Sequence, residues 1–121
     1  MKRPSKLHHL AVAGSLFFLI APDAGMAAPI QGLGAQACAS FASNFKKNPM
    51  MEAFYFTWAQ GYMSGLNMGL LAIGNEMTDL SDFDIDRQQS FIRRFCDRHP
   101  LKNYSDAAVG LLTTIREKQG L

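Results

Sequence analysis

The sequence predicts an all-α protein: a small four-helix domain with a buried central helix and one disulfide. The first observation behind this prediction is a stretch from residue 53 to residue 75 that contains no charged residue. The second is that apolar residues recur at helical spacing in three other segments: 36–45, 87–98 and 105–119. The third is that the chain has only two cysteines, Cys38 and Cys96.

Residues 1–27 have the pattern of a secretory signal peptide. Three basic residues within the first six precede the apolar run 10–20, which is too short to span a bilayer and is followed by small residues. We expect cleavage after Ala27, which leaves residues 28–121 as a single exported domain. Without the leader the chain has nine basic and nine acidic residues, and no basic stripe indicates nucleic-acid binding.

Residues 28–34 are expected to form an exposed arm, and residues 36–45 a short helix with Cys38 on its apolar face. Because both cysteines lie in the exported part, the simplest interpretation is a disulfide between Cys38 and Cys96. On the chain-entropy model, a loop of this length stabilises the fold by about 4 kcal/mol. Two free thiols or an intermolecular link are the alternatives, and the lack of a C-x-x-C pattern argues against a redox-active pair.

The charge-free stretch is expected to form the central helix, after Pro49 and up to a stop at Gly74. Small residues recur every four positions and share one face: Ala53, Thr57, Gly61, Gly65 and Gly69. A bulky stripe lies beside them: Phe54, Trp58, Tyr62 and Leu66. Since Gly inside a helix costs about 1 kcal/mol relative to Ala, we expect something to approach this backbone closely.

The candidate site therefore consists of Trp58, Gly61, Tyr62, Gly65 and Gly69, either as core or as a partner-binding surface. Polar residues within the same helix argue against the alternative of a transmembrane span. We expect no stable membrane insertion once the signal peptide is removed.

The acidic segment 76–86 lacks helical periodicity and is expected to be a connecting loop. Either Asp84 or Asp86 would cap the helix at 87–98, because a carboxylate suits a helix N-terminus. The arginines of that helix are expected on a solvated face rather than in a patch for an anionic partner: Arg93, Arg94 and Arg98. The last helix is expected to start with Ser105 as its N-cap and to end at Gly120.

Residues that carry chemistry are few in the exported part. Asp82, Asp84 and Asp86 have the spacing that opens a calcium-binding EF-hand loop, but arginines occupy the positions that need glycine and glutamate. The exported part has one histidine, His99, next to a proline, and no nucleophile motif accompanies it. We therefore expect no metal site, no cofactor and no enzymatic activity.

Two short motifs carry a resemblance to a known family. The segments 37–41 (ACASF) and 95–100 (FCDRHP), the latter followed by Asn103 and Tyr104, resemble those of the HdeA/HdeB-like periplasmic proteins. That resemblance implies an all-α fold held by Cys38–Cys96. It also implies an acid-stress chaperone (a holdase) that binds unfolded client proteins, and a homodimer that exposes apolar surface when its carboxylates are protonated.

The central helix resembles a second group. Its segment 58–65 (WAQGYMSG) is similar to the Tai-type immunity proteins, exported helical domains that block toxins delivered by type VI secretion. Those proteins usually carry further cysteines, which this chain lacks. The sequence thus predicts a protein as the partner, either unfolded clients or a toxin, and leaves the choice between them open.

Overall fold

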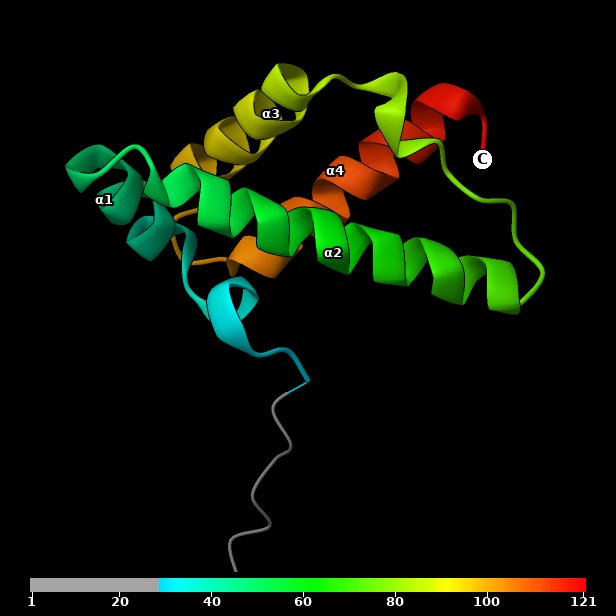
Figure 1. The fold of residues 1–121 in the computed structure, drawn as a ribbon, viewed down its shortest axis with the longest axis horizontal. Coiled ribbons are helices and arrows are strands. Elements are labelled where there is room, and N and C mark those ends of the chain that lie inside the picture. Colours follow the sequence, from blue (N-terminus) through cyan, green and yellow to red (C-terminus); the bar gives the residue numbers. More distant parts are fainter. Residues whose placement is uncertain (1–28) are drawn as a thin grey trace, which may run out of the picture.

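A computed structural model describes residues 29–121 and consists of four α-helices and two short 3₁₀ helices (Figure 1). The elements in chain order are η1 (Gly32–Ala35), α1 (Cys38–Lys47), α2 (Met51–Ala72), η2 (Leu80–Asp82), α3 (Ile85–Arg98) and α4 (Tyr104–Gln119). The described part contains no strand, only an isolated bridge between Ala37 and Asn103. The predicted four-helix, all-α fold is therefore confirmed. The expected signal peptide and its cleavage site lie outside the described residues.

The Cys38–Cys96 disulfide is present, with an S–S distance of 2.10 Å, and it joins the first residue of α1 to the last turn of α3. Next to it, the Cys38 N–H donates to the Lys102 carbonyl over 2.8 Å, and the Tyr104 N–H donates to the Gln36 carbonyl over 2.8 Å. The disulfide and these main-chain bonds hold the start of α1 against the turn between α3 and α4.

The core draws on all four helices. At its centre, the rings of Phe41, Tyr55 and Tyr104 lie 4.9–5.1 Å apart in tilted or edge-on pairs, the geometry that aromatic side chains prefer. The other fully buried large side chains are Met63, Ile92, Leu111 and Ile115. Gln36 accepts a hydrogen bond from the Tyr55 hydroxyl, and the Asn44 side chain donates to the same hydroxyl over 3.0 Å.

The helix boundaries lie within two residues of those expected. The first helix, α1, begins and ends two residues later, and α3 begins at Ile85, inside the segment 76–86 that was expected to be a loop and that also contains η2.

The N-terminal caps follow local signals, with one correction. Asp84 caps α3, since its carboxylate accepts from the Arg87 N–H over 2.7 Å. The N-cap of α4 is Asn103, not Ser105 as expected. Asp106 in the first turn accepts from the Asn103 N–H over 2.9 Å, while Ser105 is buried inside the helix, so the capping signal falls two residues earlier.

The two predicted glycine stops are confirmed. Gly74 follows α2 with a φ of +82°, and Gly120 follows α4 with a φ of +76°. After α2, the Gly74 N–H donates to the Leu71 carbonyl and the Asn75 N–H to the Leu70 carbonyl, the paired bonds of a Schellman motif. Only a residue that tolerates left-handed geometry closes a helix in this way at low cost.

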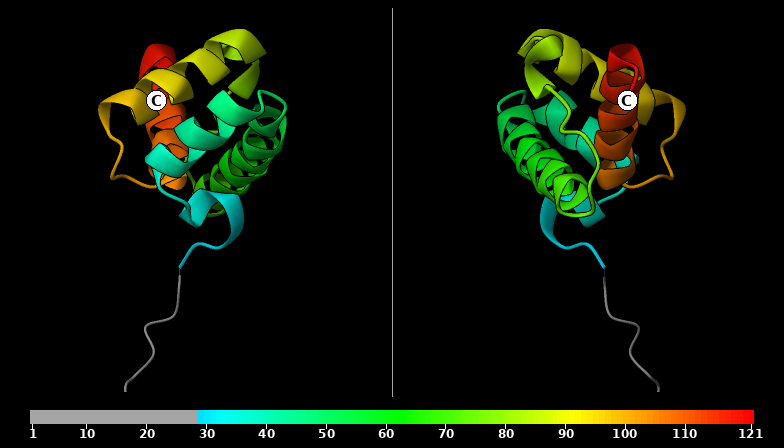
Figure 2. Two further views of the ribbon diagram at one scale, coloured as in Figure 1. Left: turned by 90° about the vertical axis from the view of Figure 1, so that its left-hand side faces the viewer. Right: turned by 90° about the vertical axis from the view of Figure 1, so that its right-hand side faces the viewer.

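The prediction of a buried central helix holds for one side of α2 only. Its buried residues are Tyr55, Phe56, Ala59, Met63 and Asn67, whereas every member of the small-residue row is exposed. The buried residues recur every three to four positions, as the small-residue row does, and most of them have larger side chains. Burial of the larger side chains removes more apolar area from water, so their side of α2 faces the core. Figure 2 shows α2 along one flank of the domain rather than at its centre. None of the described helices is long and apolar enough to cross a membrane.

Candidate functional site

The five candidate residues on α2 fall into two groups. Gly61, Gly65 and Gly69 point away from the core, and a Cβ built on any of them meets no atom of the described chain within 4 Å. Trp58 and Tyr62 are half-buried at the border of this open side, with their rings stacked 4.8 Å apart. The close approach expected at the glycines is therefore not made by any part of residues 29–121, and within these residues the three glycines do not belong to the core.

A close approach does occur at Gly34, which was expected to belong to an exposed arm over residues 28–34. Pro29, Gln31 and Gly32 are exposed as expected, but the expectation is wrong for Leu33 and Gly34, because η1 packs on α2 and Gly34 is buried against the indole of Trp58. A Cβ on Gly34 would lie only 1.9 Å from the Trp58 Cη2 atom. Leu33 also packs on the core. The arm is thus part of the domain, and Trp58 is its anchor.

We call the exposed, charge-free side of α2 its outer face. It is made up of Ala53, Phe54, Thr57, Gly61, Gly65, Met68, Gly69 and Ala72. Phe54 is 62% exposed and Met68 57% exposed. Leu71 in the last turn of α2 is also exposed, as are Ile73 and Met77 after the end of the helix. Single exposed apolar side chains are common on protein surfaces, whereas several along one side of a helix are not.

The loop that follows α2 is tied to the domain by three side-chain amides. Asn67 bonds the main chain of Thr78 in both directions, and Gln119 bonds the main chain of Asp79 in both directions. Gln88 donates to the carbonyls of Leu80 and Phe83. Sequence reasoning missed all three, although Asn67, a polar residue inside an apolar stretch, was the available signal.

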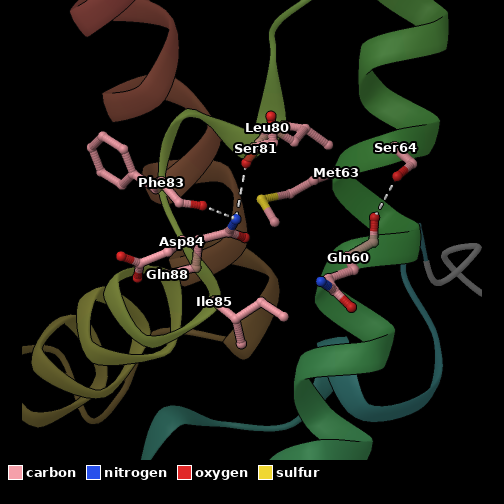
Figure 3. A pocket seen from close by; sticks show the side chains of 9 residues that line it. All are labelled: Gln60, Met63, Ser64, Leu80, Ser81, Phe83, Asp84, Ile85 and Gln88. Carbon is pink, nitrogen blue, oxygen red and sulfur yellow. Dashed lines mark hydrogen bonds between the residues drawn. The ribbon is translucent and has the colours of Figure 1, made fainter.

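Two adjoining hollows lie between α2 and this loop. The first, about 490 Å³, is lined by α2, the η2 region and the start of α3, as Figure 3 shows. The second, about 540 Å³, continues toward the end of α2. They share Ser64, Leu80 and Ser81, and we call them together the α2–loop groove.

Charged groups make two ion pairs in the described part of the chain. The Arg93 Nη1 atom donates to both carboxylate oxygens of Glu52 over 2.6 and 2.7 Å, so Arg93 is half-buried rather than free in solvent as expected. Lys118 pairs with Asp82 over 2.9 Å. This ion pair lowers the pKa of Asp82, and the hydrogen bond from the Ser81 hydroxyl lowers the pKa of Asp79.

The residues considered above for metal binding or catalysis have structural roles or lie at the surface. Asp82 pairs with Lys118 and Asp84 caps α3, and no three His, Cys, Asp or Glu residues within 29–121 are grouped so that they could hold a metal. The His99 ring is exposed and rests 4.7 Å from the Phe95 ring. Burial raises the pKa of Tyr104 well above its ordinary value, so this phenol stays neutral.

Comparisons of the chain with protein-family models, with curated proteins and with solved structures find no match.

Proposed function

We propose that this protein is exported to the periplasm and acts there as a binding protein for other proteins, in the manner of an HdeA/HdeB-like acid-stress holdase rather than an enzyme. One observation carries the proposal: the outer face of α2 is exposed over the length of the helix and contains no formal charge. Apolar surface of this kind favours unfolded chains, which expose apolar side chains of their own.

The glycines of the outer face add a geometric reason. With no Cβ at three positions four residues apart, another backbone can approach α2 more closely than it can approach an ordinary helix. Phe54 and Met68 beside them supply apolar side chains, and Met in particular adapts to partners of different shape. A second copy of the chain could cover the same face at neutral pH, which is how a homodimer would fit this proposal.

The charge balance favours a response to acid. Residues 28–121 contain nine acidic and nine basic residues, so protonation of the carboxylates converts a neutral chain into a strongly positive one. Self-repulsion then loosens contacts between copies. The Asp82–Lys118 pair loses its negative partner once the pH falls through the lowered pKa of Asp82.

The test is the aggregation of an acid-sensitive client at pH 2–3, followed by light scattering, with and without the disulfide-bonded protein. We expect scattering to fall when the protein is added at equimolar amounts, and to be unaffected by the same mass of an unrelated small helical protein. Client aggregation that proceeds unchanged would remove the holdase proposal.

A second function, immunity or inhibition in the manner of the Tai-type proteins, is favoured by the shape of segment 58–65. There the open backbone of Gly61 and Gly65 lies beside the stacked rings of Trp58 and Tyr62. Together they form a surface with a depression at the glycines and a projection at the two rings. A single folded partner suits such a surface. A stable 1:1 complex at neutral pH with the product of a neighbouring toxin gene would support this function, and binding of many unrelated unfolded clients would count against it.

A further inference from the structure

Residues 29–35, which include η1, are held to the domain by apolar packing alone. Within the described part of the chain, no hydrogen bond or ion pair joins them to residues 37–121. Leu33 packs on the core, and Gly34 is buried against Trp58. A segment with few buried contacts and no hydrogen bonds to its surroundings can open locally while the rest of the domain stays folded.

The chain is tied firmly from Gln36 onward. The Gln36 carbonyl accepts from the Tyr104 N–H over 2.8 Å, and the Gln36 side chain accepts from the Tyr55 hydroxyl. Two residues later, the Cys38–Cys96 disulfide fixes the start of α1. The segment before Gln36 can therefore leave the surface of the domain without breaking any of these bonds.

The surface beneath this segment is the indole of Trp58, the only tryptophan in the chain. A Cβ built on Gly32 would lie 3.6 Å from the Trp58 Nε1 atom, and one on Gly34 would lie 1.9 Å from the Cη2 atom at the other end of the ring. The main chain of residues 32–34 therefore lies along the indole, and at Gly34 only a residue without a Cβ allows this contact. Figure 1 shows η1 at the edge of the domain, beside α2.

Removal of the segment would expose more of the Trp58 ring. That ring is half-buried, stacks on Tyr62 and meets Tyr104 edge-on with 6.3 Å between the ring centres. Because Trp58 and Tyr62 border the outer face of α2, the newly exposed indole would extend that face with an aromatic side chain. Aromatic side chains supply a large share of the binding energy at many protein interfaces.

We propose that residues 29–35 are a releasable strap, and that an uncharged apolar segment of a bound protein displaces the strap and packs on Trp58 in its place. The sequence of the strap, PIQGLGA, indicates the chemistry of this competitor, because the chain itself covers the indole with glycine main chain beside an apolar side chain. The strap has no charged side chain, so a competitor for its place needs none. The inference rests on the proposed role of the outer face, which it extends to Trp58.

The first experiment measures the strap in the free, disulfide-bonded protein at pH 7, through the quenching of Trp58 fluorescence by acrylamide. Leu33→Ala removes apolar packing from the strap, and Leu101→Ala makes the same change at a position that is 94% exposed. We expect the quenching constant to rise at least about twofold in Leu33→Ala and to stay unchanged in Leu101→Ala.

A third variant controls for a general loss of stability. Ile92→Val weakens the core on α3 and should be quenched like the parent protein. An unchanged quenching constant in Leu33→Ala, or an equal rise in Ile92→Val, would overturn the strap.

The second experiment measures the binding of reduced and alkylated lysozyme, a permanently unfolded client, by fluorescence anisotropy of the labelled client at pH 3. The apparent dissociation constant is the intrinsic one divided by the fraction of the protein in which the strap is open. We therefore expect Leu33→Ala to bind at least about threefold more tightly than the parent protein, and Leu101→Ala and Ile92→Val to bind like the parent.

The outcomes separate the strap from the proposed function. Equally tight binding by Leu33→Ala and the parent protein would overturn the displacement and leave the outer face as the binding surface. Absence of binding by both proteins would overturn the proposed function and the displacement together.

Discussion

The side-chain amide of Asn67 and the main chain of Thr78 form two hydrogen bonds, one in each direction and each 2.8 Å long. Both residues are buried, at 4% and 3% exposed. Asn67 lies in the last third of α2 and Thr78 in the loop that returns from it, so this pair fixes the path of the loop and one side of the α2–loop groove. The Arg116 side chain donates to the Thr78 hydroxyl over 2.8 Å and ties the same point to α4.

Replacing Asn67 by alanine removes both bonds and leaves the buried N–H and carbonyl of Thr78 without partners. We expect Asn67→Ala to lower the free energy of unfolding by about 2–4 kcal/mol, measured by urea denaturation at pH 7. The matched control is Ser64→Ala one turn earlier, where the hydroxyl only bonds the Gln60 carbonyl in an exposed position. It should change stability by less than about 0.5 kcal/mol, and equal effects of the two substitutions would contradict the role of Asn67.

Two glycine-to-alanine substitutions should act in opposite directions. Gly34→Ala places a Cβ within 1.9 Å of the Trp58 ring, so η1 or the indole must move, and we expect a loss of about 1–3 kcal/mol with a shift in tryptophan fluorescence. Gly61→Ala meets open space on the outer face, and we expect a gain of about 1 kcal/mol from helix propensity alone. Thermal unfolding of both variants measures the difference. Destabilisation by Gly61→Ala would show that its face is packed against something in the free protein.

Removal of the disulfide tests the tie between α1 and α3. The bond spans 58 residues of sequence, and the double variant Cys38→Ser, Cys96→Ser should lose about 4 kcal/mol on the chain-entropy model. The measurement is chemical denaturation of the variant beside the oxidised parent protein, and the reduced parent should behave like the variant. A loss below about 1 kcal/mol would mean that the main-chain bonds around Cys38 suffice to hold this end of the domain.

The Asp82–Lys118 pair gives a pH dependence with a definite sign. The ion pair lowers the pKa of Asp82 below its value in the unfolded chain, which is about 3.9. Its contribution to stability is therefore present above that unfolded value and is lost as the pH falls through the folded pKa. Lys118→Met should raise the pKa of Asp82 toward its ordinary value, measured by an NMR titration of the carboxyl carbon.

Asp79 is the internal control for this titration. Its pKa is lowered mainly by the hydrogen bond from the Ser81 hydroxyl, which Lys118→Met leaves in place. The pKa of Asp79 should therefore stay low in the variant. An Asp82 pKa that does not move in the variant would show that the Asp82–Lys118 ion pair is not formed in solution.

Local signals in the sequence were enough to find the four helices and to place their ends within about two residues. Asp84, Gly74 and Gly120 act through neighbours within a few residues, and the two cysteines have only each other to pair with in the described chain. The capping of α4 was misplaced by two residues because Asn103 and Ser105 are both good N-cap residues, and only the reach of Asp106 decides between them.

Several of the contacts that sequence reasoning missed join residues far apart in the chain. The side of α2 that faces inward is decided by the side chains of α4 and η1 that pack against it. The row of glycines alone does not indicate which side that is. Gly34 meets Trp58, and Gln119 meets Asp79, across separations of 24 and 40 residues. The exposed outer face and the groove both result from such non-local packing. The residues of the candidate site could therefore be identified from the sequence, but their contacts and exposure could not.

The most direct test of the proposed function is a charge placed on the outer face. Gly65→Lys adds a cation in open space on α2, and Thr113→Lys adds the same charge at an exposed position on α4. Both variants should fold as judged by circular dichroism. In the client aggregation assay at pH 2–3, we expect Gly65→Lys to lose most of its protection, because binding would bury the new charge, and Thr113→Lys to protect like the unmodified protein. Full protection by Gly65→Lys would contradict the assignment of the outer face of α2 as the binding surface.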